Sequence, residues 1–140
     1  MTRQNRIAMT LLKIAAIYLV ANLAIGMYMA ITDNHALATV HSHIALLGWV
    51  TMALTGLVYL LVPSCGGHRL AVAHFWLHNI GLPIMIGALT VVIQTGDSTA
   101  EPVIGVGSTL VVLGLACFVV NLFRHAVPAA AAGDRPASAG

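Results

Sequence analysis

The sequence predicts an all-α protein, an integral membrane four-helix bundle. Of its 140 residues, 59% are hydrophobic and 7% are charged, whereas charged residues make up about a quarter of a soluble domain. A helix that crosses a bilayer needs ~20 mainly apolar residues, and four runs of that length nearly fill the chain. We therefore expect one membrane domain over residues 1–127. A disordered cytoplasmic tail rich in Ala, Pro and Gly is expected over residues 128–140.

The first two spans are expected at residues 7–31 and 38–62. The first run is longer than the ~7–15-residue apolar core of a secretory signal peptide, so we expect it to remain in the protein as a span. A turn cluster, Thr32-Asp33-Asn34, separates the two runs, and Pro63 ends the second. We expect Thr39 to cap the second helix.

The third and fourth spans are expected at residues 70–94 and 103–123. Gly66-Gly67 forms a turn before the third span, and Gly96-Asp97-Ser98 breaks the chain after it. A proline inside a helix removes one backbone hydrogen bond. We therefore expect Pro83 to kink the third span.

The positive charges predict the orientation. They lie at the start of the chain, in the turn between the second and third spans, and after the fourth span, at Arg3, Arg6, Lys13, Arg69, Arg124 and Arg135. The two remaining loops contain Asp33, Asp97 and Glu101 but no Lys or Arg. By the positive-inside rule both termini are expected to be cytoplasmic, in what we take to be a bacterial inner membrane.

The charge and the cysteine positions argue against a nucleic-acid partner, a disulfide and covalently attached haem. The formal charge of +2 comes from scattered groups rather than from a basic patch, so we expect no nucleic-acid partner. A disulfide would have to join Cys65, in a turn, to Cys117, inside an apolar run, and we expect none. Neither cysteine belongs to a Cys-x-x-Cys-His motif, so any haem would be bound without a covalent tether.

His41 and His43 are the first candidate ligands, because histidines inside a hydrocarbon layer are rare and need a partner. At ~100° per residue, two positions along a helix place side chains about 200° apart. The pair therefore cannot chelate one ion together. Such a helix can instead serve two cofactors, one on each side, or one cofactor and one hydrogen bond.

His74 and His78 are the second candidates. They are four residues apart and so share one face of a helix, a spacing by which two imidazoles reach one metal ion. No Cys, Asp or Glu joins them, so we place a structural or proton-conducting role before metal binding. His35, in the outer loop, is at a depth from which it could approach the first pair.

The middle third of the chain resembles a known family. His41-Ser42-His43 is followed by Ala45-Leu46-Leu47-Gly48-Trp49 and by Gly56-Leu57-Val58-Tyr59-Leu60-Leu61-Val62-Pro63. This series resembles the tenth helix of the catalytic subunit, subunit I, of haem-copper oxidases, closest to their C-family and nitric oxide reductase branch. Ala73-His74-Phe75-Trp76-Leu77, with Gly81, is similar to the start of the next helix there. The chain thus resembles a short four-helix homologue of that region.

The resemblance implies that His41 binds a high-spin haem and His43 a low-spin haem, on opposite faces of the helix. The copper site and the other low-spin ligand of the family lie on helices that have no counterpart in this sequence. A second copy of the chain or another subunit would have to supply the missing ligand. Because the family's twelve helices form three four-helix arcs, a homotrimer would mimic the whole, with haem held between His41 of one subunit and His43 of the next.

We therefore expect a membrane protein that binds b-type haem through His41 and His43 and transfers electrons, or binds or reduces a diatomic gas such as oxygen or nitric oxide. The sequence leaves open whether it is an oxidoreductase and what its redox partner is. One alternative is a copper-binding protein that uses His74, His78, Met52 and Met85, since imidazole and thioether suit copper. The other is a non-catalytic membrane subunit whose histidines only pack helices.

Overall fold

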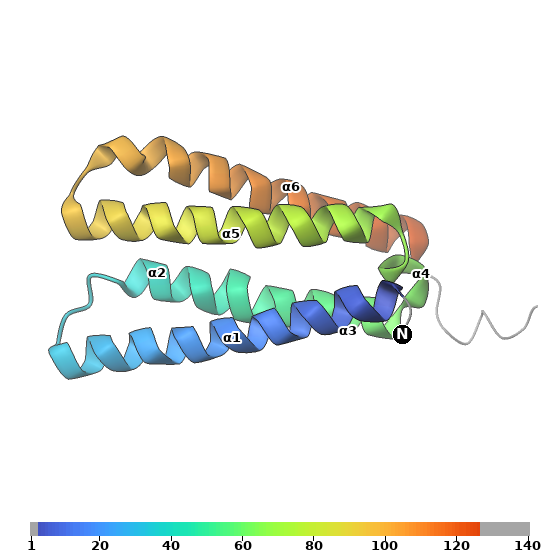
Figure 1. Cartoon of the computed structure of the whole chain (residues 1–140), viewed down its shortest axis with the longest axis horizontal. Helices are drawn as coiled ribbons and strands as arrows, with labels where there is room; N and C mark the ends of the chain where they lie inside the picture. The colour runs from blue at the N-terminus through green and yellow to red at the C-terminus, as the bar shows by residue number, and fades with distance from the viewer. Residues whose placement is uncertain (1–2, 127–140) are drawn as a thin grey trace, which may run out of the picture.

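Four long antiparallel helical segments form the protein, as seen in a computed structural model that describes residues 3–126 (Figure 1). The elements are α1 (Arg3–Thr32), α2 (Ala38–His43), η1 (Ile44–Thr51), α3 (Met52–Leu61), α4 (Pro63–Gly66), α5 (Arg69–Thr95), η2 (Ser98–Ala100) and α6 (Glu101–His125). No strand occurs among these residues. The all-α bundle is therefore confirmed, whereas the tail expected at 128–140 lies outside the described residues.

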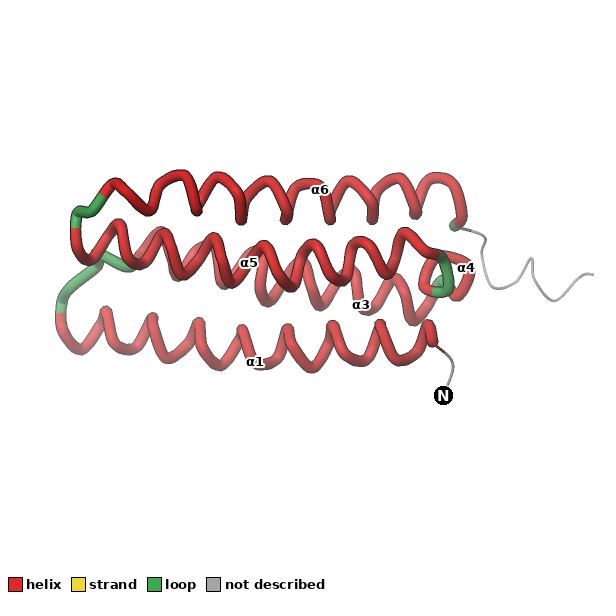
Figure 2. Tube along the Cα trace, turned by 45° about the horizontal axis from the view of Figure 1, so that its top comes forward, coloured by secondary structure: helices red, strands yellow, loops and turns green. Residues whose placement is uncertain are grey.

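The helix bounds lie close to the predicted spans. Four segments are long and apolar enough to cross a membrane, Asn5–Thr32, Ala38–Leu61, Arg69–Thr95 and Ser98–His125. Loops are confined to the two ends of the bundle (Figure 2). The expected cap at Thr39 is wrong, because the helix begins at Ala38 and Leu37 occupies the cap position without a side-chain bond. The turn is closed instead by Ala38 N–H, which donates to the His35 carbonyl at 3.0 Å.

The second span is one continuous helix with a wide middle. α2 and α3 are joined by η1, a π-helix of eight residues, and the backbone remains right-handed helical at both junctions. The span ends at Val62, whose φ of −119° and ψ of 82° leave the helical region directly before Pro63. A π segment of this length is uncommon, and such segments are frequent at functional sites.

The bundle consists of two helical hairpins. α1 packs along the second span, and α5 packs along α6, with the most extensive contact between α5 and α6 (Figures 1 and 2). Glycine lets the second pair approach closely: a Cβ at Gly81 would lie 2.7 Å from the Gly107 carbonyl oxygen, and one at Gly107 would lie 2.5 Å from Met85 N. Small residues at a helix contact allow this kind of packing in membranes.

Glycine also allows close packing in the first hairpin, between α1 and the second span. A Cβ at Gly56 would lie 3.2 Å from the Ala8 carbonyl oxygen and 3.3 Å from Leu11 Cβ, and one at Gly48 would lie 2.7 Å from the Tyr18 ring. Ala8 and Leu11 are fully buried there. These close contacts run along most of α1, from Ala8 to Gly26.

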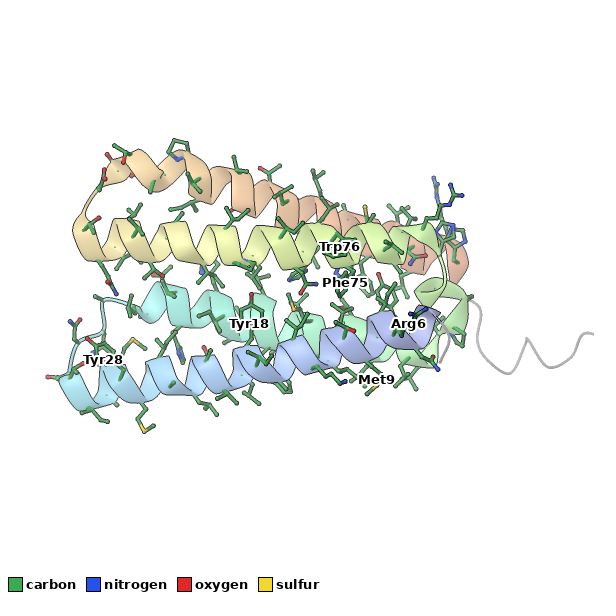
Figure 3. The ribbon with its side chains drawn as sticks, viewed as in Figure 1. Arg6, Met9, Tyr18, Tyr28, Phe75 and Trp76 are labelled. Atoms are coloured by element: carbon green, nitrogen blue, oxygen red, sulfur yellow. The ribbon has the colours of Figure 1, made fainter. Side chains whose placement is uncertain are left out.

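The outer surface of the bundle is apolar, as expected for an integral membrane protein. Ile31 is 77% exposed and Phe123 is 87% exposed, and many smaller apolar side chains on all four spans also face outward. The two ends of the bundle carry different side chains. Arg6 lies at the end that carries α4, and Tyr28 lies at the opposite end (Figure 3). Asp97, at that opposite end, accepts a bond from Thr99 N–H at 2.9 Å, which lowers the pKa of its carboxyl.

Gly107→Ala should destabilise the bundle, because the new methyl group would meet the backbone of α5, which cannot move aside without shifting the helix. Overpacking of this kind costs about 1–3 kcal/mol. Gly105→Ala is the matched control, since a Cβ there meets no atom within 4 Å and alanine favours the helix by up to ~1 kcal/mol. Thermal unfolding in a mild detergent measures both. Equal melting temperatures for the two variants would contradict the close α5–α6 contact.

Candidate functional site

His41 and His43 each use the same ring nitrogen to bond a backbone carbonyl. His41 Nδ1–H donates across to the Asn22 carbonyl of α1 at 3.1 Å, and His43 Nδ1–H donates to the Thr39 carbonyl of its own helix at 2.8 Å. A carbonyl can only accept, so Nδ1 carries the proton in both rings. Among the described residues, neither Nε2 has a hydrogen-bond partner, so the lone pair of each Nε2 is free.

The two rings lie on different sides of α2. The His41 ring lies against α1, where a Cβ at Gly26 would come within 3.1 Å of its Cε1, so glycine makes the room that this ring needs. His43 lies in a shallow surface hollow with Ser42, Leu46 and Leu47. The divergence expected from the helical spacing is therefore present. The hollow at His43 is lined by one helical segment only and forms one wall of a site.

His74 and His78 lie in the centre of the bundle and are fully buried. His74 Nδ1 is 3.1 Å from the Tyr59 hydroxyl, and His78 Nε2–H donates to the Leu47 carbonyl at 3.1 Å. The ring centres are 5.5 Å apart and the rings are perpendicular. Both bonds cross from the second hairpin to the first.

Tyr59 and Asn121 extend this polar cluster toward the end that carries α4. Tyr59 is fully buried and contacts the Phe118 ring at 5.6 Å between centres. Asn121, also fully buried, donates through Nδ2 to the Cys65 carbonyl at 2.9 Å, and the Cys65 thiol donates to the Asn121 carbonyl at 3.7 Å. Burial raises the pKa of the Cys65 thiol, which favours the protonated thiol over the thiolate.

The π segment η1 lies beside both histidine pairs. It begins directly after His43, and two of its carbonyls are satisfied by side chains. Thr51 Oγ1–H donates to the Leu46 carbonyl at 2.7 Å, and His78 donates to that of Leu47. Side chains that supply donors to backbone carbonyls stabilise such local widening of a helix.

The other three histidines lie at the two ends of the bundle. His35 is exposed in the turn between α1 and α2, and only its carbonyl is used in the hydrogen bonds found among the described residues. His68 and His125 stack at the α4 end with ring centres 4.0 Å apart, a pairing that their separation in the sequence gave no reason to expect. His68 Nδ1 also accepts from Leu70 N–H at 3.2 Å and so caps α5.

Phe75 and Trp76, which follow His74 in the sequence, line a different hollow. Their rings are 5.3 Å apart, perpendicular, and lie with Arg6 and Thr10 between α5 and α1 (Figure 3). The sequence did not identify the partners that Tyr59, Asn121 and the Asn22 carbonyl provide. The signal available was the presence of polar side chains inside apolar runs, which predicts a hydrogen-bond partner but not its identity.

His41 and His43 are separate candidate imidazole ligands, and His74 and His78 form one pair with ring centres 5.5 Å apart. Within residues 3–126, no three His, Cys, Asp or Glu side chains gather in a way that could hold a metal ion. Comparison of the chain with protein-family models, with curated proteins and with solved structures found no match.

Tyr59→Phe should lower the melting temperature, because it leaves His74 Nδ1 buried without a partner. An unpaired buried polar group costs about 1–3 kcal/mol. Tyr28→Phe is the matched control: Tyr28 is 52% exposed at the far end, and a surface change of this kind stays within about 0.5 kcal/mol. Thermal unfolding in detergent compares them, and equal shifts would show that the bond to His74 contributes nothing.

Proposed function

We propose that this protein binds b-type haem through Nε2 of His41 and of His43. The observation that carries the proposal is that a backbone carbonyl takes the Nδ1 proton of each ring. Histidines that bind metals almost always donate their other ring N–H in this way, which fixes the tautomer and the ring orientation. Both residues are thus prepared as axial ligands before any haem is present.

The shape of the His43 site favours an assembly. Its lining residues come from a single helical segment, whereas a buried haem needs apolar walls on both faces. The second wall would come from another copy of the chain or from another subunit. A closed homotrimer, with His41 of one protomer and His43 of its neighbour on the same haem, uses both ligands and repeats by symmetry.

Two functions follow from the number of imidazoles on the iron. Haem held by two imidazoles suits electron transfer, and haem held by one keeps an open axial position for a diatomic gas. The resemblance to the haem-copper oxidase catalytic subunit supports both as oxidoreductase roles. We further propose that the end with Arg6, Arg69 and Arg124 faces the bacterial cytoplasm, because the loops at the other end carry acids and no Lys or Arg.

A reduced-minus-oxidised visible spectrum of the full chain, purified in mild detergent from cells supplied with ample haem, tests the proposal. The wild-type protein should give sharp b-type α and Soret bands. His41→Ala and His43→Ala should each lower the haem bound per protein about tenfold or more, since a lost ligand costs at least as much as the 10–100-fold of a lost supporting bond. A shift of the bands by carbon monoxide would identify an open axial position.

His35→Ala tests the third histidine that could approach this site; because His35 is exposed in the turn between α1 and α2, the variant should keep the wild-type spectrum. Bands that survive in both ligand variants would overturn the assignment. Folded wild-type protein with copper and no haem would favour the copper alternative at His74 and His78. Folded protein with neither would favour a structural subunit.

A further inference from the structure

The end of the bundle that carries α4 has basic side chains and, within residues 3–126, no acidic one. The basic side chains at or near this end include Arg6, Lys13, Arg69 and Arg124. The acidic residues of the described part of the chain all belong to the turns at the opposite end (Figure 1). No carboxylate of that part neutralises these cations, and this favours an anionic partner at the α4 end.

A hollow at this end opens between α1 and α5 and has a volume of about 290 Å³. Its lining consists of Arg6, Ile7 and Thr10 from α1 and of Val72, Phe75 and Trp76 from α5 (Figure 3). One cation and one hydroxyl thus lie beside four largely apolar side chains. A surface of this composition suits a ligand that is itself charged at one end and apolar at the other.

The polar groups of the hollow are hydrogen-bond donors without a partner. Among residues 3–126, the Arg6 guanidinium, the Thr10 hydroxyl and the Trp76 indole form no hydrogen bond and no ion pair. Elsewhere in the bundle a threonine hydroxyl bonds to its own helix, as Thr90 does to the Ile86 carbonyl at 2.8 Å. A guanidinium and a hydroxyl that are free to donate match the oxygen atoms of a phosphate group.

The cation and the aromatic rings lie at different depths along the bundle. α1 begins at Arg3 and α5 begins at Arg69, both at this end. At ~1.5 Å per residue, Arg6 lies about 4.5 Å from the start of α1 and Trp76 about 10 Å from the start of α5. Trp76 is 58% exposed. The charged part of the hollow is therefore nearer the membrane surface, and the apolar part extends toward the hydrocarbon.

We propose that this hollow binds one anionic glycerophospholipid, with its phosphate at Arg6 and Thr10 and an acyl chain along Phe75 and Trp76. Guanidinium binds phosphate through two parallel hydrogen bonds, and basic pockets between membrane helices bind anionic headgroups. A free phosphate ion would leave the apolar wall without a partner. A zwitterionic headgroup would bring an ammonium group into a region that is already basic.

The aromatic wall suits an acyl chain. The rings of Phe75 and Trp76 are perpendicular, with centres 5.3 Å apart, so they form a corner rather than a flat surface. Phe75 also packs against the buried core, which fixes its position. A flexible methylene chain can follow such a corner and contact both rings. The site uses none of the histidines and is independent of the haem proposal.

Quenching of tryptophan fluorescence in vesicles tests the site, because Trp76 is part of it. The full chain is placed in vesicles that contain a low fraction of phosphatidylglycerol or phosphatidylcholine brominated on the acyl chain. The signal of Trp76 is the part that disappears in Trp76→Phe, a change at an exposed position that leaves the core intact. Brominated phosphatidylglycerol should quench this signal more strongly than brominated phosphatidylcholine at the same fraction.

Arg6→Gln should lower the preference for the anionic lipid about fivefold, the factor expected for one basic side chain beside an anionic surface. Arg124→Gln is the matched control. It removes the same charge at the same end but lies on α6, outside the hollow, and should keep the wild-type preference. Inorganic phosphate, added at an ionic strength matched with chloride, should also leave it unchanged.

Three results would overturn the proposal. Equal quenching of wild-type Trp76 by the two lipids would show ordinary contact with the bilayer. Equal losses in Arg6→Gln and Arg124→Gln would show attraction to the whole basic end rather than binding in this hollow. Loss of the preference in inorganic phosphate would show a site for the free ion instead of a lipid.

Discussion

Inside a bilayer there is no water to satisfy a polar group, so each such group must find its partner within the protein. The contact between the two hairpins depends on this constraint. Close glycine packing holds α5 to α6 and α1 to the second span, but these contacts lie within each hairpin. Across the hairpins, His74 bonds to Tyr59 and His78 bonds to Leu47. Those two bonds fix how far one hairpin slides along the other, because either imidazole would be stranded in an apolar core if the register changed.

The same side-chain type has two different roles, and the difference lies in burial and in the choice of ring nitrogen. His74 and His78 are fully buried and bond across the bundle, and the second nitrogen of each ring is buried as well. His41 and His43 are only partly buried, and each is anchored through Nδ1 with Nε2 free. A large flat cofactor could not reach His74 and His78 without disrupting the core. It has access to His43, which opens onto the outer surface. The candidate cofactor site and the structural polar cluster are therefore separate, although η1 touches both.

Hydropathy was sufficient to predict the four spans, because one property, apolar length, decides where a chain crosses a bilayer. The bounds differ by a few residues: α1 starts at Arg3 rather than at 7, since helix continues into the polar boundary where hydropathy gives no signal. The opposite orientation of His41 and His43 also followed from helical spacing. The partners of His74 and His78 did not, because they depend on the register between hairpins that are not adjacent in sequence. The π segment could not be predicted from the sequence either, because two of its carbonyls accept hydrogen bonds from Thr51 and from His78 of another helix.

The exposure pattern has a consequence for how a cofactor site would be completed. A protein that used its core histidines for a cofactor would need a cavity there, yet the rings of His74 and Tyr59 pack against Phe118. The candidate ligand that lies in a surface hollow is His43, beside Leu46, which is 61% exposed. An exposed apolar side chain next to an oriented imidazole is stable in lipid and equally stable against another apolar helix. Completing the His43 site with a second chain would therefore cost no polar contact, and it would add the second wall that the monomer lacks.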